Sequence, residues 1–526
     1  MSIRKNLLLP DAIRWSLDEP VIELRNVSKS FGETQIINDL SLTIQTGKTT
    51  VIAGESGSGK SVLLRMMNGL TFPDSGQVML FGQDLAQIDE HTRTLLRKRC
   101  TMVFQSYALI DSLTVLDNIG FPLAENTSMP SKEIKTLVMD LLEMLELTHA
   151  ADVLPASLSG GMKKRVALAR AVITNPEVVL FDEPTTGLDP VMIEFVDSLI
   201  MRTQREYEIT SVIISHDMAS NRRLADSMAV LSGGQIITHG TFDDVRRSTL
   251  PQVIEFMGDA PMERMSDTVT TAETIDDIDE PTIVEIDQLH KSFGDNHVLR
   301  GISFSIPKKK ITTVIGGSGS GKSVLIKHII GLFQPDSGSI KVFGTELTTC
   351  SKSALQSVQA RVGMLFQGAA LFDSMTARDN IAFPLIEERK KTKKDIAARV
   401  QEVAERLSVS DILDRMPDSI SNGQKKRVAL ARALITEPEI MIYDEPTTGQ
   451  DPVMMKRVDD MIVEAAEKFD ITSIVISHDM NSTFRIADRV AMIKDGELVI
   501  FGSPDTLRRS DDPRVRAFIF AGSTAE

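Results

Sequence analysis

The sequence predicts an α/β fold that is built twice in tandem. Short continuous apolar runs, such as residues 178–181 and 440–443, are typical of buried parallel strands. They alternate with segments of helical periodicity, such as 131–150 and 393–410, and this alternation favours a largely parallel core sheet. The chain also repeats itself at a constant offset of 262 positions. We therefore expect two copies of one α/β domain.

The repeat extends over most of the chain. The runs SGSGKSVL, KKRVALARA and DEPTTG begin at residues 56, 163 and 182 and recur at 318, 425 and 444. This places the first domain at 20–261 and the second at 282–526. Residues 1–19 form an extension without an evident counterpart in the second copy. Residues 262–281 are acidic and rich in threonine, and we interpret them as a flexible linker.

Within each copy the same elements follow in order. Two strands precede a glycine-rich loop and its helix, a Pro-Asp-Ser-Gly turn follows, and a longer helix precedes two buried strands. In the first copy these are the strand at 21–25, the strand at 50–53, the helix at 62–67, the turn at 73–76, the helix at 131–150 and the strands at 178–181 and 211–215. Their counterparts lie at 283–287, 312–315, 324–329, 335–338, 393–410, 440–443 and 473–477.

A glycine-rich loop joins the second strand of each copy to the helix that follows. Residues 54–61 read GESGSGKS and residues 316–323 read GGSGSGKS, and both fit the P-loop pattern G-x-x-x-x-G-K-[ST]. Glycines let backbone N–H groups close around phosphate oxygens, the lysine reaches the β- and γ-phosphates, and the serine offers a hydroxyl to Mg²⁺. We therefore predict that ATP and Mg²⁺ bind here. The predicted ligands are Gly54, Gly57, Gly59, Lys60, Ser61, Gly316, Gly319, Gly321, Lys322 and Ser323.

A pair of carboxylates ends the next buried strand in each copy. These residues are Asp182 and Glu183 in the first copy and Asp444 and Glu445 in the second. The aspartate can hold Mg²⁺, and the glutamate can orient or deprotonate the water that attacks the γ-phosphate. With a P-loop upstream, the pattern predicts hydrolysis of ATP.

The first copy contains the run LSGGM at 158–162, followed by a basic helical segment. With these motifs the chain resembles the ABC ATPase superfamily over about 21–260 and 283–520. The resemblance implies a P-loop NTPase fold with a mainly parallel core sheet, an antiparallel β subdomain and a helical subdomain. It also implies adenine-stacking aromatics, Q-loop glutamines that contact the Mg²⁺ and water site, signature residues that bind the γ-phosphate, D-loop aspartates and catalytic switch histidines. The aromatics are Phe31 and Phe293, and the Q-loop glutamines are Gln105 and Gln367. The signature residues are Ser159, Gly160, Gly161, Ser421 and Gly423. The D-loop aspartates are Asp189 and Asp451, and the switch histidines are His216 and His478.

The two signatures differ. The second reads ISNGQ at 420–424, where Asn422 replaces a glycine that could approach a phosphate closely. In the family that the chain resembles, two nucleotides are buried between two domains packed head to tail, so the site of Lys60 would receive the signature with Asn422. We therefore expect unequal hydrolysis at the two sites. Because one chain carries both domains, the resemblance implies that no homodimer is required.

Further segments resemble the MlaF-like ATPases of Mla/Mce phospholipid transport. These are the methionine after the signature glycines, residues 108–122 and 370–384, the run GQDP at 449–452 and the tail at 512–518. The resemblance implies a separate Mla-type permease, an MCE-domain protein and phospholipid as indirect cargo. The permease would contact the regions 105–160 and 367–422. The tandem fusion departs from the family pattern of separate ATPase chains and leaves open whether a small stabilising subunit is needed.

The charge and composition of the chain limit which kinds of partner and which cellular compartment are compatible with it. The net charge of −15 and the pI of about 5.2 argue against a basic nucleic-acid-binding surface. The two cysteines, Cys100 and Cys350, are not equivalent in the repeat, which argues against a disulfide framework and fits a reducing cytoplasm. No apolar stretch of about 18 residues and no signal-peptide core occur in the sequence. We therefore expect the chain to stay in the cytoplasm where it is made, and the resemblance to transporter ATPases implies a peripheral location on the cytoplasmic face of the inner membrane.

Two alternatives remain open at this point. The ATPase of a monosaccharide importer is also a tandem fusion of about this size, often with one degenerate signature. ABC-F proteins are tandem translation factors that bind ribosomes, but they usually have a longer, charged helical linker. The short acidic linker and the anionic chain suit ribosomal RNA poorly.

Overall fold

The computed structural model describes residues 19–257 and 280–520. The predicted extension at 1–19 and the predicted linker at 262–281 therefore lie almost entirely outside the described residues. The chain divides into two compact units, one built mostly from residues before position 261 and the other mostly from residues after it. Both units have the predicted α/β fold.

The first unit contains two sheets. An antiparallel sheet has the strand order β2-β1-β4-β5, and a six-stranded core sheet has the order β10-β9-β3-β8-β7-β6. The core sheet is parallel except for β10, which pairs with β9 in the antiparallel sense. The strands are β1 (Pro20–Phe31), β2 (Thr34–Gln45), β3 (Thr49–Gly54), β4 (Ser75–Leu80), β5 (Gln83–Asp84), β6 (Cys100–Val103), β7 (Val178–Asp182), β8 (Thr210–Ile214), β9 (Ser227–Ser232) and β10 (Gln235–Gly240).

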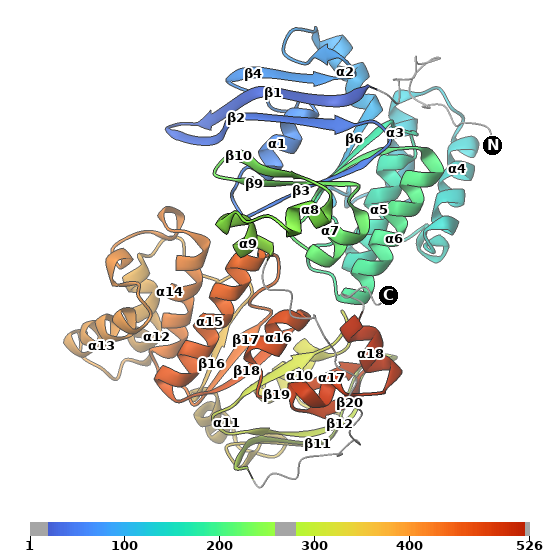
Figure 1. Ribbon diagram of the computed structural model, residues 1–526. Helices are drawn as coiled ribbons and strands as arrows, with labels where there is room; N and C mark the ends of the chain where they lie inside the picture. Colours follow the sequence, from blue (N-terminus) through green and yellow to red (C-terminus); the bar gives the residue numbers. More distant parts are fainter. Residues whose placement is uncertain (1–18, 258–279, 521–526) are drawn as a thin grey trace. The chain divides into compact units, whose positions relative to one another are not determined.

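Helices surround this core sheet, and α3, α4 and α5 gather as a helical layer in Figure 1. The helices are α1 (Lys60–Met67), α2 (Glu90–Arg99), α3 (Val115–Asn126), α4 (Ser131–Met144), α5 (Gly160–Val172), α6 (Pro190–Tyr207), α7 (Met218–Leu224), α8 (Phe242–Arg246) and α9 (Pro251–Met257). Short 3₁₀ turns lie at Thr148–Ala150 and Pro155–Ser157. One apolar cluster lies between the antiparallel sheet, α1 and the core sheet, and another joins the core sheet to the helical layer.

The second unit repeats this architecture, with sheet orders β12-β11-β14-β15 and β16-β17-β18-β13-β19-β20. Its strands are β11 (Thr282–Phe293), β12 (Asn296–Pro307), β13 (Ile311–Ile315), β14 (Ser337–Val342), β15 (Thr345–Glu346), β16 (Val362–Leu365), β17 (Ile440–Asp444), β18 (Thr472–Ser477), β19 (Arg489–Lys494) and β20 (Glu497–Gly502). Its helices are α10 (Lys322–Ile329), α11 (Lys352–Gln359), α12 (Ala377–Glu388), α13 (Lys393–Arg406), α14 (Asn422–Leu434), α15 (Pro452–Phe469), α16 (Met480–Ile486), α17 (Pro504–Arg508) and α18 (Pro513–Phe520). 3₁₀ turns lie at Ser410–Ile412 and Pro417–Ser419.

The helices expected at 131–150 and 393–410 end earlier than predicted. The structure ends α4 at Met144 and α13 at Arg406. Each helix is stopped by a residue in the left-handed conformation, Glu146 (φ 56°) or Ser408 (φ 55°). The following amide then bonds back to the carbonyl five residues earlier, at 2.8 Å and 2.9 Å respectively, as in a Schellman ending. Because neither residue is glycine, no clear stop signal for these helices is visible in the sequence.

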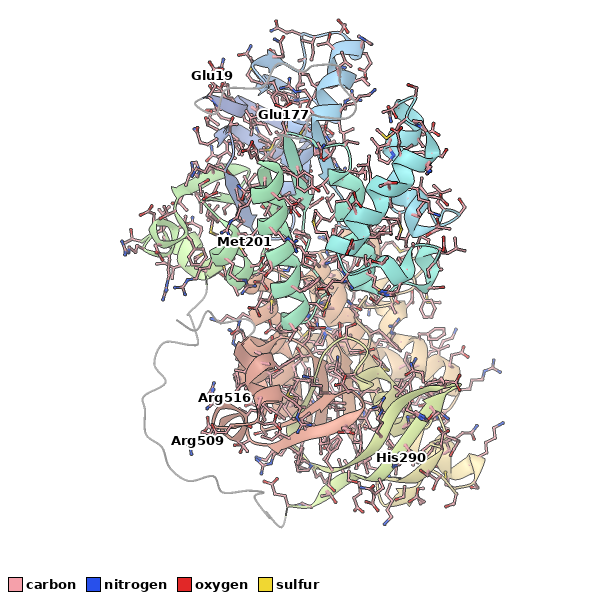
Figure 2. The ribbon with its side chains drawn as sticks, turned by 90° about the vertical axis from the view of Figure 1, so that its right-hand side faces the viewer. Glu19, Glu177, Met201, His290, Arg509 and Arg516 are labelled. Carbon is pink, nitrogen blue, oxygen red and sulfur yellow. The ribbon has the colours of Figure 1, made fainter. Side chains whose placement is uncertain are left out.

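An ion pair ties the last residue of α2 to the start of β7 in the first unit. Arg99 donates from Nε and from a terminal nitrogen to the carboxylate of Glu177, at 2.5 Å and 2.9 Å, and Glu177 is labelled in Figure 2. Arg361 and Glu439 form the same pair in the second unit, at 2.6 Å and 2.7 Å. The strand that ends in the candidate catalytic carboxylates is therefore anchored at its beginning in both copies.

Cys100 is buried at the start of β6, and Cys350 is partly buried just before α11. No helix among residues 19–257 and 280–520 is both long and apolar enough to cross a membrane.

Candidate nucleotide-binding and catalytic sites

The predicted P-loop lies between β3 and α1 in the first unit, and between β13 and α10 in the second. Glycine is sterically required at its two ends. A Cβ on Gly54 would lie 2.2 Å from the carbonyl oxygen of Leu231, and a Cβ on Gly59 would lie 2.7 Å from Ile37 Cδ1. Gly316 and Gly321 are equally restricted, at 2.1 Å and 2.7 Å from their nearest neighbours. Gly57 and Gly319 have φ values of 84° and 79°, which favour glycine.

The P-loop lysines point into their own loops. Lys60 Nζ donates to the carbonyl oxygens of Gly54 and Glu55, both at 2.8 Å. Lys322 Nζ donates to those of Gly316 and Gly317, at 2.8 Å and 2.9 Å. Burial lowers the pKa of both ammonium groups, although nearby carboxylates oppose this effect. Each loop thus holds a cation at the N-terminus of a helix, where phosphate groups bind favourably.

The predicted magnesium ligands meet in the first unit. Ser61, the second residue of α1, donates from its hydroxyl to Asp182 Oδ1 at 3.2 Å. Burial raises the pKa of Asp182, and the hydrogen bond from Ser61 opposes this rise. A hydroxyl beside one carboxylate fits Mg²⁺, which binds hard oxygen ligands and usually completes its shell with phosphates and water. In the second unit Asp444 ends β17, but no hydrogen bond joins it to Ser323 in the described residues.

The carboxylate of Glu183 is held on both oxygens. Oε1 lies 3.4 Å from His216 Nδ1, and Oε2 accepts from the Thr186 hydroxyl at 2.8 Å and from Gln105 Nε2 at 3.3 Å. Burial opposes ionisation of Glu183, but the hydrogen bonds from His216 and Thr186, together with the charge of Lys60, keep its pKa below the usual value. The carboxylate is therefore suited to act as an ionised base.

The second unit has a similar but looser arrangement. Glu445 Oε1 lies 3.7 Å from His478 Nδ1, and Oε2 accepts from the Thr448 hydroxyl at 3.0 Å. The neighbouring His478 imidazole is the strongest influence on the pKa of Glu445 and lowers it. Gln367 lies two residues beyond β16, and no hydrogen bond joins it to Glu445 in the described chain.

A buried aspartate supports the helix that follows each of these histidines. Asp197 on α6 accepts from the Ser220 hydroxyl at 2.7 Å and from Arg223 at 2.6 Å. Asp459 on α15 accepts from Ser482 at 3.0 Å and from Arg485 at 3.3 Å. Sequence reasoning missed this pair, because an aspartate inside an amphipathic helix has no motif around it.

An exposed aromatic ring ends the first strand of each unit. Phe31 and Phe293 are 53% and 47% exposed, which leaves a face open for stacking. The predicted Pro-Asp-Ser-Gly turn supports each strand end. Asp74 accepts from Ser30 N at 2.7 Å and from Lys29 Nζ at 2.6 Å, and Asp336 accepts the same two bonds from Ser292 and Lys291 at 2.6 Å and 2.9 Å. The recurrence of this turn in both copies was a signal for its role that the sequence analysis did not use.

Serine residues cap the helices that carry the predicted signatures. Ser159 Oγ accepts from Met162 N at 3.3 Å at the start of α5. Ser421 forms a full capping box with Gln424 at the start of α14, with bonds of 3.3 Å and 3.0 Å. A Cβ on Gly160 would lie 3.7 Å from the Tyr107 hydroxyl, which is an ordinary contact. The unit's own fold therefore does not require glycine at this position, which is consistent with Asn422 at the start of α14.

Two residues after each predicted Q-loop glutamine, the backbone enters a left-handed conformation. Tyr107 and Ala108 have φ values of 65° and 48°, and Ala369 and Ala370 have values of 60° and 50°. An arginine near the end of the signature helix holds both carbonyls. Arg170 donates to Tyr107 O at 2.9 Å and to Ala108 O at 2.7 Å. Arg432 donates to Ala369 O at 3.0 Å and to Ala370 O at 2.7 Å. We call this pair of bonds the arginine clamp; sequence reasoning did not identify it.

The sequence profile of ABC transporters matches the chain twice, at residues 37–186 and 299–448. The chain belongs to the ABC transporter family. Both matches lie inside the predicted domains, whose outer boundaries stay a prediction. The protein is the ATP-binding subunit of an ABC transporter, and it is an ATPase. Its P-loops, its Asp-Glu pairs and its signature helices are therefore those of two ABC ATPase domains in tandem.

Three similar proteins illustrate the relationship. An ABC transporter ATP-binding protein of Methanocaldococcus jannaschii is 29% identical over 535 residues, covering 93% of this chain and 96% of that protein. The intermembrane phospholipid transport system ATP-binding protein MlaF of Haemophilus influenzae is 35% identical over 241 residues, covering 46% of this chain and 91% of MlaF. The solved structure of CbiO1 from Clostridium perfringens, part of the cbiONQ transporter complex, is 28% identical and covers 46% of this chain and 95% of CbiO1, with a TM-score of 0.42.

In the ABC ATPase, the structure brings together Ser61 with Asp182, and Glu183 with Gln105 and His216, within the first unit. Asp189 and Asp451 lie directly before α6 and α15. The functional roles of all these residues stay predictions.

Proposed function

We propose that this ABC ATPase uses ATP and Mg²⁺ to power a separate membrane permease that moves phospholipid across the cell envelope. One observation carries the lipid assignment. MlaF of Haemophilus influenzae, named for intermembrane phospholipid transport, is 35% identical to this chain along 91% of its own length. The ATPase motifs cannot supply this assignment, because one catalytic core serves many cargoes.

The proposed chemistry is an in-line attack of water on the γ-phosphate. The P-loop amides with Lys60 or Lys322 bind the phosphates, and Phe31 or Phe293 stacks on adenine. Bound Mg²⁺ would neutralise phosphate charge at the oxygens of Ser61 and Asp182, or of Ser323 and Asp444, with Gln105 or Gln367 near its water shell. Glu183 or Glu445 accepts the proton of the attacking water, and His216 or His478 contacts the γ-phosphate.

The permease is proposed to bind at the Q-loop and helical subdomain of each unit. Large apolar side chains are exposed in and beside the regions 105–160 and 367–422, and a permease bound there would remove this apolar surface from water. These side chains are Phe121, Leu154, Phe366, Phe372, Ile386 and Met416, which are 39% to 49% exposed. A permease and an MCE-domain protein as partners would place the ATPase on the cytoplasmic face of the inner membrane.

Purification of the tagged full-length chain from its native membranes in mild detergent tests this function. Mass spectrometry is expected to find a Mla-type permease, an MCE-domain protein and phospholipid. A sugar permease would instead identify a monosaccharide importer, and ribosomal proteins without a permease would identify an ABC-F factor.

Two substitutions sharpen the experiment. Leu154→Asp and Met416→Asp place a charge on the proposed permease surface and should reduce co-purification while ATP is still hydrolysed. Leu250→Asp is the control, because Leu250 is 41% exposed but lies just before α9, outside these regions. Equal loss of the permease with all three variants would contradict the proposed surface.

A further inference from the structure

The backbone at both candidate catalytic glutamates is in a conformation that side chains disfavour. Glu183 and Glu445 have φ values of 51° and 47°, in the left-handed region. Their amides are held by Ile214 O at 3.0 Å and Ile476 O at 3.1 Å. A strained residue at an active site stays in place only when its surroundings hold it there. The contacts around the carboxylate therefore bear on catalysis.

In each unit, the threonine three residues after the glutamate donates a hydrogen bond to the same oxygen of the glutamate carboxylate. The hydroxyl of Thr186 donates to Glu183 Oε2 at 2.8 Å, and that of Thr448 donates to Glu445 Oε2 at 3.0 Å. Each threonine amide also bonds to the carbonyl of its glutamate, at 3.4 Å and 3.3 Å, which closes a tight turn. With Oε2 occupied in this way, Oε1 is the oxygen turned toward the switch histidine.

A buried lysine of the signature helix holds each of these turns. Lys164 lies on α5 and is 7% exposed, and its ammonium donates to the carbonyl oxygen of Thr186 at 2.6 Å. Lys426 on α14 is also 7% exposed, and it donates to the carbonyl oxygen of Pro446 in the equivalent turn. Burying an ammonium group is unfavourable unless it is paired, so a buried lysine used in this way in both units indicates a definite task.

We propose that Thr186 and Thr448 are positioning residues for Glu183 and Glu445, and that Lys164 and Lys426 anchor the turns that carry them. This inference rests on the proposed role of the two glutamates in hydrolysis. The threonine hydroxyl stops rotation of the carboxylate about its last bond, so that Oε1 faces the histidine and the attacking water. The lysine ties this alignment to the helix that begins at the signature serine.

The decisive comparison uses the full chain with both threonines changed to valine or both changed to serine. Valine has nearly the shape of threonine but no hydroxyl, whereas serine keeps the hydroxyl. For Thr186→Val with Thr448→Val we expect kcat to fall about 10- to 100-fold, while KM for ATP stays within about twofold. Thr186→Ser with Thr448→Ser should restore kcat to within about threefold of the parent chain. A valine chain with kcat within about twofold of the parent, or a serine chain as slow as the valine chain, would overturn the inference.

A second pair of variants keeps the test valid if the valine chain does not fold. Lys164→Met with Lys426→Met removes the ammonium groups but keeps most of the apolar stem, and it should also lower kcat with little change in KM. Lys163→Met with Lys425→Met is the matched control, because these neighbours are only partly buried and should leave kcat unchanged. Equal rates for the two methionine chains would reject the anchoring role.

A variant of the two glutamates distinguishes failure of this inference from failure of the proposed hydrolysis chemistry. Glu183→Gln with Glu445→Gln should abolish hydrolysis while the chain still binds a non-hydrolysable ATP analogue. If this variant keeps its activity, the proposed role of the glutamates is wrong. If it is inactive and the valine chain is fully active, only the positioning role is wrong.

Discussion

Two equivalent aspartates in the two units differ in how well their charge is compensated. Burial raises the pKa of Asp197 to about 6, and it raises the pKa of Asp459 to about 7. Asp197 receives two bonds from Arg223, whereas Arg485 donates a single longer bond to Asp459, and Asp459 Oδ1 has no hydrogen-bond partner in the described structure. The charged form of Asp459 is therefore the less stable of the two.

A pH-dependent stability follows for the second unit. Asp459 faces Ser482, Arg485, Asp479 and Asp460, and its folded pKa of about 7 lies above the ordinary value of 3.8. A raised pKa means that the contribution of this group is fully present below about pH 4 and is lost as the pH rises through about 7. Asp459→Asn cannot ionise, so it should be more stable than the parent chain at pH 8, by up to a few kcal/mol, and similar at pH 4.

Urea unfolding of the full chain at both pH values checks this expectation. Asp197→Asn is the control variant. It should gain less stability at pH 8, because Arg223 compensates the charge of Asp197 better than Arg485 compensates that of Asp459. A stability difference between Asp459→Asn and the parent chain that is independent of pH would contradict the assignment.

At the scale of single residues, the sequence could predict those that belong to motifs. The P-loop residues and the strand-end carboxylates were predicted because their types and spacing suit phosphate and Mg²⁺ chemistry, whereas the histidines were predicted from the family resemblance. Thr186 and Lys164 also lie inside recognised motifs, but their roles depend on which carbonyl or carboxylate their atoms reach. That information appears only when α5 packs beside the turn after β7.

Among the elements, the arginine clamp joins the signature helix to the Q-loop within each unit. Two adjacent left-handed residues are unfavourable, and a guanidinium with two donors can hold two neighbouring carbonyls where a lysine cannot. Arg170→Lys should therefore loosen residues 105–110 and lower the free energy of unfolding by about 2 kcal/mol. Hydrogen exchange of the 105–110 amides, together with thermal unfolding, measures both effects.

Arg25→Lys is the control for this prediction, because Arg25 is exposed and pairs only with Glu23 in the described residues. Unchanged exchange at 105–110 in the Arg170→Lys chain would show that the clamp does not hold the loop.

The strands and helices that were expected from the sequence occur in the expected order, and the strands at 178–181 and 211–215 agree with β7 and β8 to within one residue. Elements such as β2, α2 and α6 were not predicted. Helix ends were predicted less well. Glu146 and Ser408 stop α4 and α13 in a conformation for which neither residue has a strong preference. Tertiary packing of Leu147 and Val409, both fully buried, decides these ends.

Over the whole molecule, the two copies share one architecture but not every functional detail. Asn422 stands where the first copy has Gly160, and the Glu445–His478 pair is longer than the Glu183–His216 pair. We therefore expect the two ATP sites to hydrolyse at unequal rates. In the full chain, Glu183→Gln and Glu445→Gln made singly should reduce steady-state turnover by different factors.

The substitution Asn422→Gly restores the missing glycine in the second signature. When Asn422→Gly is combined with Glu183→Gln or with Glu445→Gln, the two variants should reduce steady-state turnover by more similar factors. Equal losses from the two single glutamine variants would count against the asymmetry.

The arginine clamp has an evolutionary consequence. In the arginine clamp, Arg170 and Arg432 donate to backbone oxygens, so the side chains of Tyr107, Ala108, Ala369 and Ala370 take no part in these bonds. The first copy has tyrosine at position 107, and the second has alanine at the equivalent position 369. After a duplication, each copy could acquire its own side chains on this loop without losing the loop's shape. A fused chain could in this way adapt its two halves to two different surfaces while a single inherited framework is kept.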